Sequence, residues 1–261
     1  MCRASMRLLL AALCLTLATD ATAQAAKGGK RQIVVSAAVS LTDVLQQIAP
    51  LYQAKSGEQI VLNLASSNTL ARQISFGAGA DVFISADEAQ MNAVASYIDP
   101  ATRVDLLSNQ LAIAVPDDRP RRIASARDLL DSSIRRIAIG DPAAVPAGVY
   151  AKQYLQTLGI WTDLAMKIVP SGSVRLALAA VESGAADAAI VYRTDIASAR
   201  HVREALVVPS SEGPHIVYPA AMVRSGSNAD GARRFLAFLR TPEVIAVFTR
   251  AGFLVPGAAS K

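Results

Sequence analysis

The segment Leu64-Ala-Ser-Ser-Asn-Thr-Leu-Ala-Arg-Gln-Ile74 predicts a strand that ends in hydroxyl and amide side chains and turns at once into a helix. A helix start leaves about four backbone N–H groups without acceptors inside the helix. Polar side chains favour this position, and the helix dipole gives it partial positive charge. Such a junction is able to hold a small anion, although a single one is explained equally well as an ordinary helix cap.

The rest of the chain repeats this alternation of strand and helix. Apolar runs predict strands at residues 33–37, 60–64, 81–85, 111–115, 136–140, 167–170, 188–192 and 216–223. Helical patterns follow them at residues 40–56, 66–77, 126–130, 150–158, 174–183, 231–239 and 242–251. The alternation predicts an α/β protein with mostly parallel sheets. Connections near residues 107–109 and 214–218 suggest crossovers, with 24–108 plus 218–261 in one lobe and 109–217 in the other.

Four polar junctions stand at the carboxyl ends of predicted strands, where open α/β sheets bind ligands. Their residues are Ser40, Ser67, the Pro146-Ala147-Gly148 turn and the Ser173-Val174 pair. Ser40-Leu-Thr-Asp43 has the pattern of a capping box, and Ser67 also stands where a cap is expected, so both have a structural explanation. Tyr192 closes another apolar strand, where a tyrosine commonly belongs to the core.

The first 23 residues have the features of a cleavable export signal. Arg3 and Arg7 precede an apolar run of 11 residues, and Ala21-Thr-Ala23 fits a cleavage site. The run is too short to span a membrane. Both cysteines, Cys2 and Cys14, lie in this segment, and Leu13 before Cys14 is unlike the small residue of a lipoprotein signal. We expect a soluble periplasmic protein without thiols.

Charge and motifs argue against several other functions. The signal carries net charge +1, so its removal lowers the formal charge from +5 to a mild +4, and aromatic residues make up only 5% of the chain. Nucleic-acid binding calls for denser basic patches or stacking rings. The chain has no G-x-S-x-G, H-E-x-x-H, Walker or G-x-G-x-x-G motif, and its two histidines, His201 and His215, have no companions typical of a metal site. We therefore do not expect an enzyme.

Read together, the junctions resemble the periplasmic molybdate-binding proteins of ABC importers. The matching segments span residues 33–254 and are 36–42, 65–74, 80–87, 190–192 and Gly140-Asp-Pro-Ala-Ala-Val-Pro-Ala-Gly-Val-Tyr-Ala-Lys152, the most specific of them. The resemblance implies a type 2 periplasmic binding protein fold, in which two α/β lobes with mixed, mostly parallel sheets enclose a ligand cleft. It also implies a monomer that binds molybdate or tungstate, uses no cofactor, and serves a membrane permease and ATPase.

By position, the resemblance assigns the oxyanion ligands to five residues. Ser40 and Ser67 would give hydroxyl and backbone N–H groups, Ala147 and Val174 backbone N–H groups, and Tyr192 its phenol; molybdenum would be held as molybdate by these same residues. Asn68 and Val39 depart from the family pattern, which has Ser and Ala there. Two alternatives stay open, namely a binding protein for another tetrahedral oxyanion such as sulfate, and a secreted hydrolase.

The export signal yields a first prediction. Mass spectrometry of periplasmic extract should find a mature chain that begins near Gln24 and has no free thiol, because cleavage after Ala23 removes both cysteines. A chain acylated on Cys14 would contradict this and would indicate a tethered lipoprotein.

Overall fold

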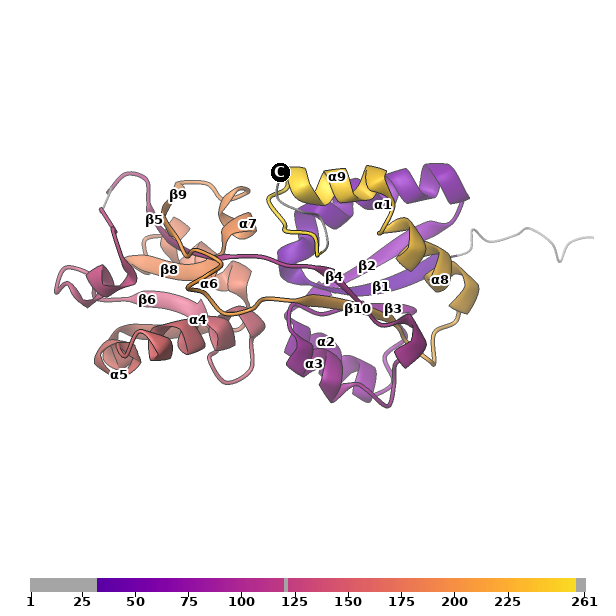
Figure 1. The fold of residues 1–261 in the computed structure, drawn as a ribbon, viewed down its shortest axis with the longest axis horizontal. Helices are drawn as coiled ribbons and strands as arrows, with labels where there is room; N and C mark the ends of the chain where they lie inside the picture. The colour runs from indigo at the N-terminus through magenta and orange to yellow at the C-terminus, as the bar shows by residue number, and fades with distance from the viewer. Residues whose placement is uncertain (1–31, 120–121, 257–261) are drawn as a thin grey trace, which may run out of the picture.

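Two five-stranded sheets form the frame of the molecule, as seen in a computed structural model that describes residues 32–119 and 122–256 (Figure 1). We call each sheet with the helices that cover it a lobe. Two stretches of chain run side by side from one lobe to the other, one leading from β4 to β5 and the other leading into β10 (Figure 1). The expected signal peptide and both cysteines lie outside the described residues.

The sheet of the first lobe combines strands from both ends of the chain. Its order is β2-β1-β3-β10-β4, with β1 at Gln32–Ala38, β2 at Gln59–Ala65, β3 at Val82–Ile84, β4 at Val104–Leu107 and β10 at Tyr218–Met222. β1 pairs in parallel with β2 and β3, while β10 is antiparallel to both β3 and β4. The sheet is thus mixed, and only β10 runs against the others.

The sheet of the second lobe repeats this arrangement. Its order is β7-β6-β8-β5-β9, with β5 at Leu111–Pro116, β6 at Ile137–Gly140, β7 at Ile168–Ser171, β8 at Ala188–Tyr192 and β9 at Val202–Val207. β6 pairs in parallel with β7 and β8, while β5 is antiparallel to β8 and β9. The reversed strand in each sheet, β10 or β5, is the one that a crossover enters, so the crossovers explain the mixed sheets.

Helices cover both faces of each sheet. In the first lobe, α1, α8 and α9 lie on one face, and α2 and α3 lie on the other (Figure 1); their bounds are Thr42–Ser56, Ala229–Phe238, Pro242–Arg250, Ser67–Ser75 and Glu88–Ala93. In the second lobe, α4 and α6 both pack on β6 and β8, and the helices are α4 at Pro146–Thr157, α5 at Trp161–Leu164, α6 at Val174–Glu182 and α7 at Arg193–Ile196. None of the helices in the described part of the chain is long and apolar enough to cross a membrane.

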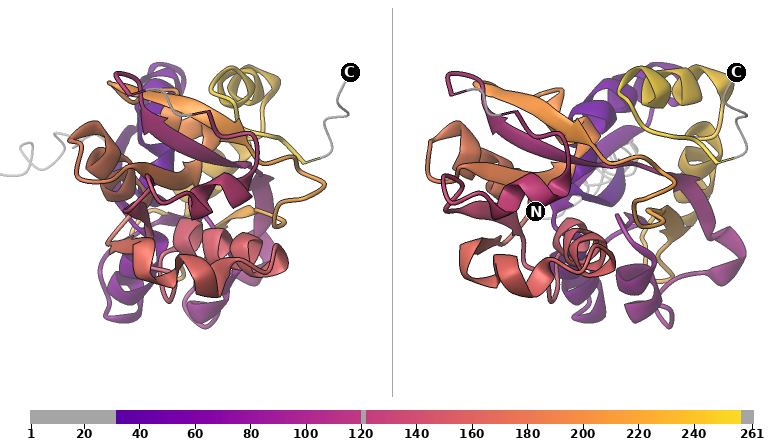
Figure 2. Two further views of the ribbon diagram at one scale, coloured as in Figure 1. Left: turned by 90° about the vertical axis from the view of Figure 1, so that its left-hand side faces the viewer. Right: turned by 60° about the vertical axis from the view of Figure 1, so that its left-hand side comes forward.

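Short 3-10 turns join several of these elements. They are η1 at Val39–Leu41, η2 at Pro100–Thr102, η3 at Ala126–Leu130 and η4 at Ala165–Lys167. The C-terminal segment also returns to the crossovers, because Leu254 forms an antiparallel bridge with Ser108 at the end of β4. The turned views in Figure 2 show the yellow C-terminal helices beside the indigo elements of the first lobe.

The apolar runs predicted as strands all form strands, and Gly57 ends α1 with φ of 74° as its position suggested. Two strands were not predicted. β9 has two adjacent charged residues, Arg203 and Glu204, and is only half-buried, and β4 is a short edge strand. Charged residues interrupt the apolar run in both strands, namely Asp105 in β4 and the Arg203-Glu204 pair in β9.

The predicted capping box at Ser40-Leu-Thr-Asp43 is wrong. A 3-10 turn, η1, precedes α1, whose N-cap is Leu41 without any side-chain capping bond. The predicted start of the helix at Tyr150 is also four residues late, because Pro146 takes the first position of α4. Proline suits this position, where its missing N–H would have had no acceptor.

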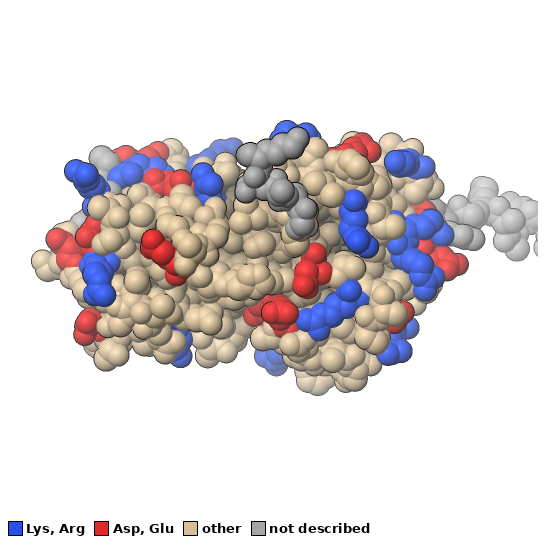
Figure 3. All heavy atoms as spheres, in the orientation of Figure 1, with Lys and Arg blue, Asp and Glu red and all other residues tan. Residues whose placement is uncertain are grey.

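Basic and acidic side chains are interspersed over the face of the molecule drawn in Figure 3. The excess of positive charge is therefore not gathered into one patch on that face. Both histidines, His201 and His215, are exposed.

A close approach between α4 and β6 explains the Gly148 of the sequence motif. A β carbon at Gly148 would overlap the carbonyl of Gly140. We predict that Gly148→Ala lowers the free energy of unfolding by about 1–3 kcal/mol, because the start of α4 must move away from β6. Gly79→Ala is the matched control, since a β carbon there meets nothing within 4 Å. Urea unfolding of both variants tests this, and equal stabilities would contradict it.

Candidate functional site

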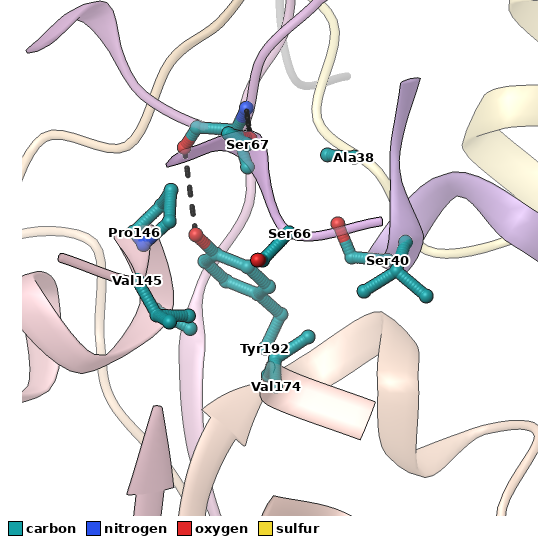
Figure 4. A pocket seen from close by; sticks show the side chains of 11 residues that line it. Ala38, Ser40, Ser66, Ser67, Val145, Pro146, Val174 and Tyr192 are labelled. Carbon is teal, nitrogen blue, oxygen red and sulfur yellow. Dashed lines mark hydrogen bonds between the residues drawn. The ribbon is translucent and has the colours of Figure 1, made fainter. Parts of the chain in front are cut away.

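A cavity between the lobes is lined by all five of the residues that the sequence singled out. Figure 4 shows it from close by, and its eleven lining residues are Ala38, Val39, Ser40, Ser66, Ser67, Ala86, Val145, Pro146, Ala147, Val174 and Tyr192. These residues lie at the ends of strands and the starts of helices in both lobes. The volume of the cavity is about 10 Å³, which is room for about one water-sized sphere. Pockets for drug-sized ligands are far larger, at about 300–1,000 Å³, so this one suits a ligand of few atoms.

Ser40 lies in the 3-10 turn after β1 and is buried. Its Oγ is 3.1 Å from the hydroxyl of Tyr218, the first residue of β10. The hydroxyl is therefore used in a contact with the second crossover. The explanation of Ser40 as a helix cap does not hold, because Leu41 is the N-cap of α1.

Ser67 is the first residue of α2, and Ser66 is the N-cap, whose side chain makes no capping bond. The backbone N–H of Ala86, in the loop after β3, donates to Ser67 Oγ at 2.9 Å. Ser67 is 1% exposed. The capping explanation therefore fails here too, and the hydroxyl instead ties the start of α2 to the neighbouring strand end.

Ala147 and Val174 bring helix starts of the second lobe to the cavity. Ala147 follows Pro146 at the start of α4, and Val174 opens α6 after Ser173, whose side chain accepts the N–H of Leu176 as a cap. The backbone N–H groups of a first turn have no acceptor within the helix, and the dipole makes that end positive. Both helices thus offer N–H donors at the cavity wall.

Tyr192 closes the cavity from the end of β8. It is 1% exposed, and its ring centroid lies 5.7 Å from that of Tyr218. Its hydroxyl donates to the carbonyl of Ala86 at 3.4 Å, the contact drawn as the longer dashed line in Figure 4. Burial raises the pKa of Tyr192, so the phenol stays protonated and acts as a donor. Tyr192 thus belongs to the buried core, as a tyrosine in an apolar strand commonly does, and also lines the cavity.

None of the eleven lining residues carries a charge. The wall consists of hydroxyls, helix-start N–H groups and apolar side chains, so its polar groups are suited to an acceptor-rich, anionic guest. Within residues 32–119 and 122–256, no three His, Cys, Asp or Glu side chains gather as a metal site requires. Of the two departures from the family pattern, Val39 lines the cavity, whereas Asn68 is not one of the lining residues.

An ion-pair cluster joins the lobes next to the cavity. Arg175, which follows Val174 in α6, reaches Asp43 of α1 across the cleft with 2.6 Å between Nη2 and Oδ2. On its other side, Arg175 Nε lies 2.7 Å from Oδ1 of the fully buried Asp195. Burial is the main influence on Asp195 and raises the pKa of its carboxyl to about 6, despite the opposing effect of Arg175. The lobes therefore meet through a charged contact as well as through Tyr192.

Sequence reasoning missed three residues near the cavity. Ala86 binds both Ser67 and Tyr192 through its backbone, while Tyr218 and Asn109 lie behind Ser40. Asn109 and Tyr218 lie in the two predicted crossovers. The sequence therefore offered one clue to them, a polar or phenolic side chain at each crossover. Apart from the contact of Ala86 with Ser67, these contacts join residues more than a hundred positions apart, which no local pattern reveals.

Residues 33–254 match the family model described as "Bacterial extracellular solute-binding protein". The chain belongs to this family. The solute-binding protein is 38% identical to the molybdate-binding protein ModA of Escherichia coli K12 over 94% of this chain and 95% of that one.

Solved structures that resemble this solute-binding protein include the following two. The periplasmic molybdate-binding protein of Azotobacter vinelandii has a TM-score of 0.78 and 26% identity, and the match covers 86% of this chain and 99% of that one. The sulfate-binding protein SubI of Mycobacterium tuberculosis has a TM-score of 0.76 at 18% identity, over 88% of each chain, and this likeness concerns the fold alone. The type 2 periplasmic binding protein fold implied by the sequence is confirmed.

The raised pKa of Asp195 predicts a pH dependence. Its folded pKa of about 6 exceeds its ordinary value of 3.8, so its contribution to stability is present below about pH 4 and is lost as pH rises through about 6. The unfolding free energy of the wild type should therefore fall over this window relative to that of Asp195→Asn, by roughly 2–3 kcal/mol. Urea unfolding between about pH 4 and pH 7 measures the difference.

Asp43→Asn is the matched control on the other side of Arg175. Burial alone would raise the pKa of Asp43, but hydrogen bonds from Arg175 and Ser198 outweigh it and lower the pKa. The wild type should thus lose stability relative to Asp43→Asn as pH falls, the opposite direction. If the stability of both variants relative to the wild type changed with pH in the same direction, the raised pKa of Asp195 and the lowered pKa of Asp43 would be contradicted.

Proposed function

We propose that this solute-binding protein binds molybdate or tungstate in the cavity and delivers it to an ABC importer. The observation that carries the proposal is a small cavity lined by hydroxyls and helix starts with no charged residue. The names of the E. coli and A. vinelandii relatives support molybdate as the anion. Ser40, Ser67, Ala147, Val174 and Tyr192 are the proposed ligands, and molybdenum is held only as the oxyanion, without a cofactor.

Neutral donors are able to hold a dianion when they are fixed in place. Helix-start N–H groups and buried hydroxyls supply partial positive charge that does not need to reorganise when the anion enters. Each oxygen of a buried anion needs its hydrogen bonds, and each missing bond costs about 1–3 kcal/mol. Molybdate and tungstate are nearly equal in size, whereas sulfate is smaller and leaves the fixed donors stretched. The site therefore favours the larger oxyanions over sulfate.

The lobes are proposed to comprise residues 24–108 with 218–261 and residues 109–217, and to close on the ligand by hinge motion at the two crossovers. Contacts between the lobes support this, because Tyr192 reaches Ala86 and Arg175 reaches Asp43 across the cleft. A cleavable signal at residues 1–23 would export the protein to the periplasm. There it would act as a monomer with a membrane permease and an ATPase and would have no catalytic role.

Calorimetry tests the proposal. We expect the mature protein to bind molybdate and tungstate one to one, and to show no binding of sulfate at millimolar concentration. Ser67→Ala should weaken molybdate binding about ten- to a hundredfold, because the oxyanion loses a buried donor worth roughly 1–3 kcal/mol. Ser75→Ala, which removes an exposed hydroxyl from the same helix, should bind like the wild type.

Melting of the ligand-free variants completes the experiment. Ser67 also accepts the N–H of Ala86, so its loss is expected to lower stability as well as affinity. Sulfate binding as tight as molybdate binding would contradict the size argument. A Ser67→Ala protein with unchanged affinity would remove Ser67 from the proposed ligands.

A further inference from the structure

A chain of buried polar groups leads from the crossovers to the cavity. Asn109 lies on the first crossover, between β4 and β5, and Tyr218 begins β10 at the end of the second. Asn109 Nδ2 is 3.3 Å from the Tyr218 hydroxyl, which is 3.1 Å from Ser40 Oγ. All three residues are buried. Of these, only Ser40 lines the cavity.

The orientation of the Asn109 amide is fixed by its neighbours. The backbone N–H of Gln110 donates to Asn109 Oδ1 at 2.8 Å, so the amide oxygen must face that group. The two hydrogens of Nδ2 are then directed to Thr194 Oγ1, at 2.9 Å, and to the Tyr218 hydroxyl. An amide nitrogen only donates. The Tyr218 oxygen is therefore the acceptor in its contact with Asn109.

The Tyr218 proton must then go to Ser40. Burial raises the pKa of Tyr218, so the phenol keeps its proton. With its oxygen already accepting from Asn109, its proton points to Ser40 Oγ, the other partner within hydrogen-bond distance. The reverse direction, with Ser40 donating to Tyr218, would leave a buried hydroxyl proton without an acceptor, which is unfavourable.

We propose that Asn109 and Tyr218 are positioning residues that hold the Ser40 hydroxyl as a hydrogen-bond donor to the cavity. This inference rests on the proposed function. When Ser40 Oγ accepts from Tyr218, its own proton is free to donate to an oxygen of the ligand. The Ser67 hydroxyl is also left free to donate, because its Oγ accepts a hydrogen bond from the N–H of Ala86.

This arrangement determines which oxyanions the site accepts. Molybdate and tungstate are fully deprotonated at neutral pH, so all their oxygens accept hydrogen bonds. Phosphate carries at least one proton at that pH, and a P–OH directed at Ser40 would meet a proton that is unable to turn away. Such a contact between two donors disfavours the ligand. The crossovers thus contribute to selectivity although neither positioning residue lines the cavity.

The experiment removes the Tyr218 hydroxyl and keeps its ring. Tyr218→Phe should weaken molybdate binding about tenfold in calorimetry and should weaken phosphate binding less, so the preference for molybdate falls. Tyr52→Phe is the matched control, since it removes a buried tyrosine hydroxyl that donates to Glu58 instead. It should lower the melting temperature without changing either affinity. Equal weakening of molybdate and phosphate by Tyr218→Phe would overturn the proposal.

A double-mutant cycle tests whether Tyr218 acts through Ser40. In a Ser40→Ala background, Tyr218→Phe should change molybdate affinity by less than about twofold, because the hydroxyl that it orients is gone. Full additivity of the two changes would show a structural role alone and would overturn the proposal.

A ligand-free measurement separates this inference from the proposed function. The buried Tyr218 hydroxyl proton should give an NMR signal that Tyr218→Phe removes and Ser40→Ala shifts, because Ser40 is its acceptor. Failure of the wild type to bind molybdate would contradict the proposed function. An unshifted Tyr218 signal in Ser40→Ala would overturn the inference that Tyr218 donates its proton to Ser40.

Discussion

The first N–H groups of a helix have no acceptors of their own, and the arrangement of the cavity depends on this requirement. α2 of one lobe and α4 and α6 of the other begin at its wall, each after a strand that ends there. The glycine pair Gly140 and Gly148 lets α4 start close against β6. Backbone geometry therefore aims the positive ends of several helices at one small space, and no lysine or arginine is needed at the wall.

The two lobes depend on each other to complete this space. Tyr192 belongs to the second sheet, but its hydroxyl contacts Ala86 of the first, and Ala86 in turn fixes the hydroxyl of Ser67. Arg175 adds a second connection from α6 to Asp43. Neither lobe has a complete set of donors alone. Separation of the lobes would thus break contacts at the cavity itself, and in this way the proposed hinge motion would be coupled to capture and release of the proposed ligand.

Local patterns predicted most of the fold. Continuous apolar runs marked the buried strands, but β9, with its adjacent Arg203 and Glu204, and β4, a four-residue strand that contains Asp105, had no such signal. The capping box at Ser40 failed because the hydroxyl contacts Tyr218, 178 positions away, and sequence spacing holds no information about that contact. The family resemblance supplied five residues that line one cavity; their role as ligands remains a prediction.

Main-chain donors have a consequence for how such a site changes over time. The N–H groups of Ala147 and Val174 are present whatever side chain stands there, proline excepted. Substitutions at these positions keep the N–H donors, so selection on binding detects such substitutions only in part. An alanine scan would not test Ala147, which is already alanine. Substitutions beneath α4 and α6 that tilt these helices would move the donors, whereas most replacements of Ala147 or Val174 would leave them in place. In such a site, the positions of the helices place most of the donors, and the identities of the side chains describe only part of it.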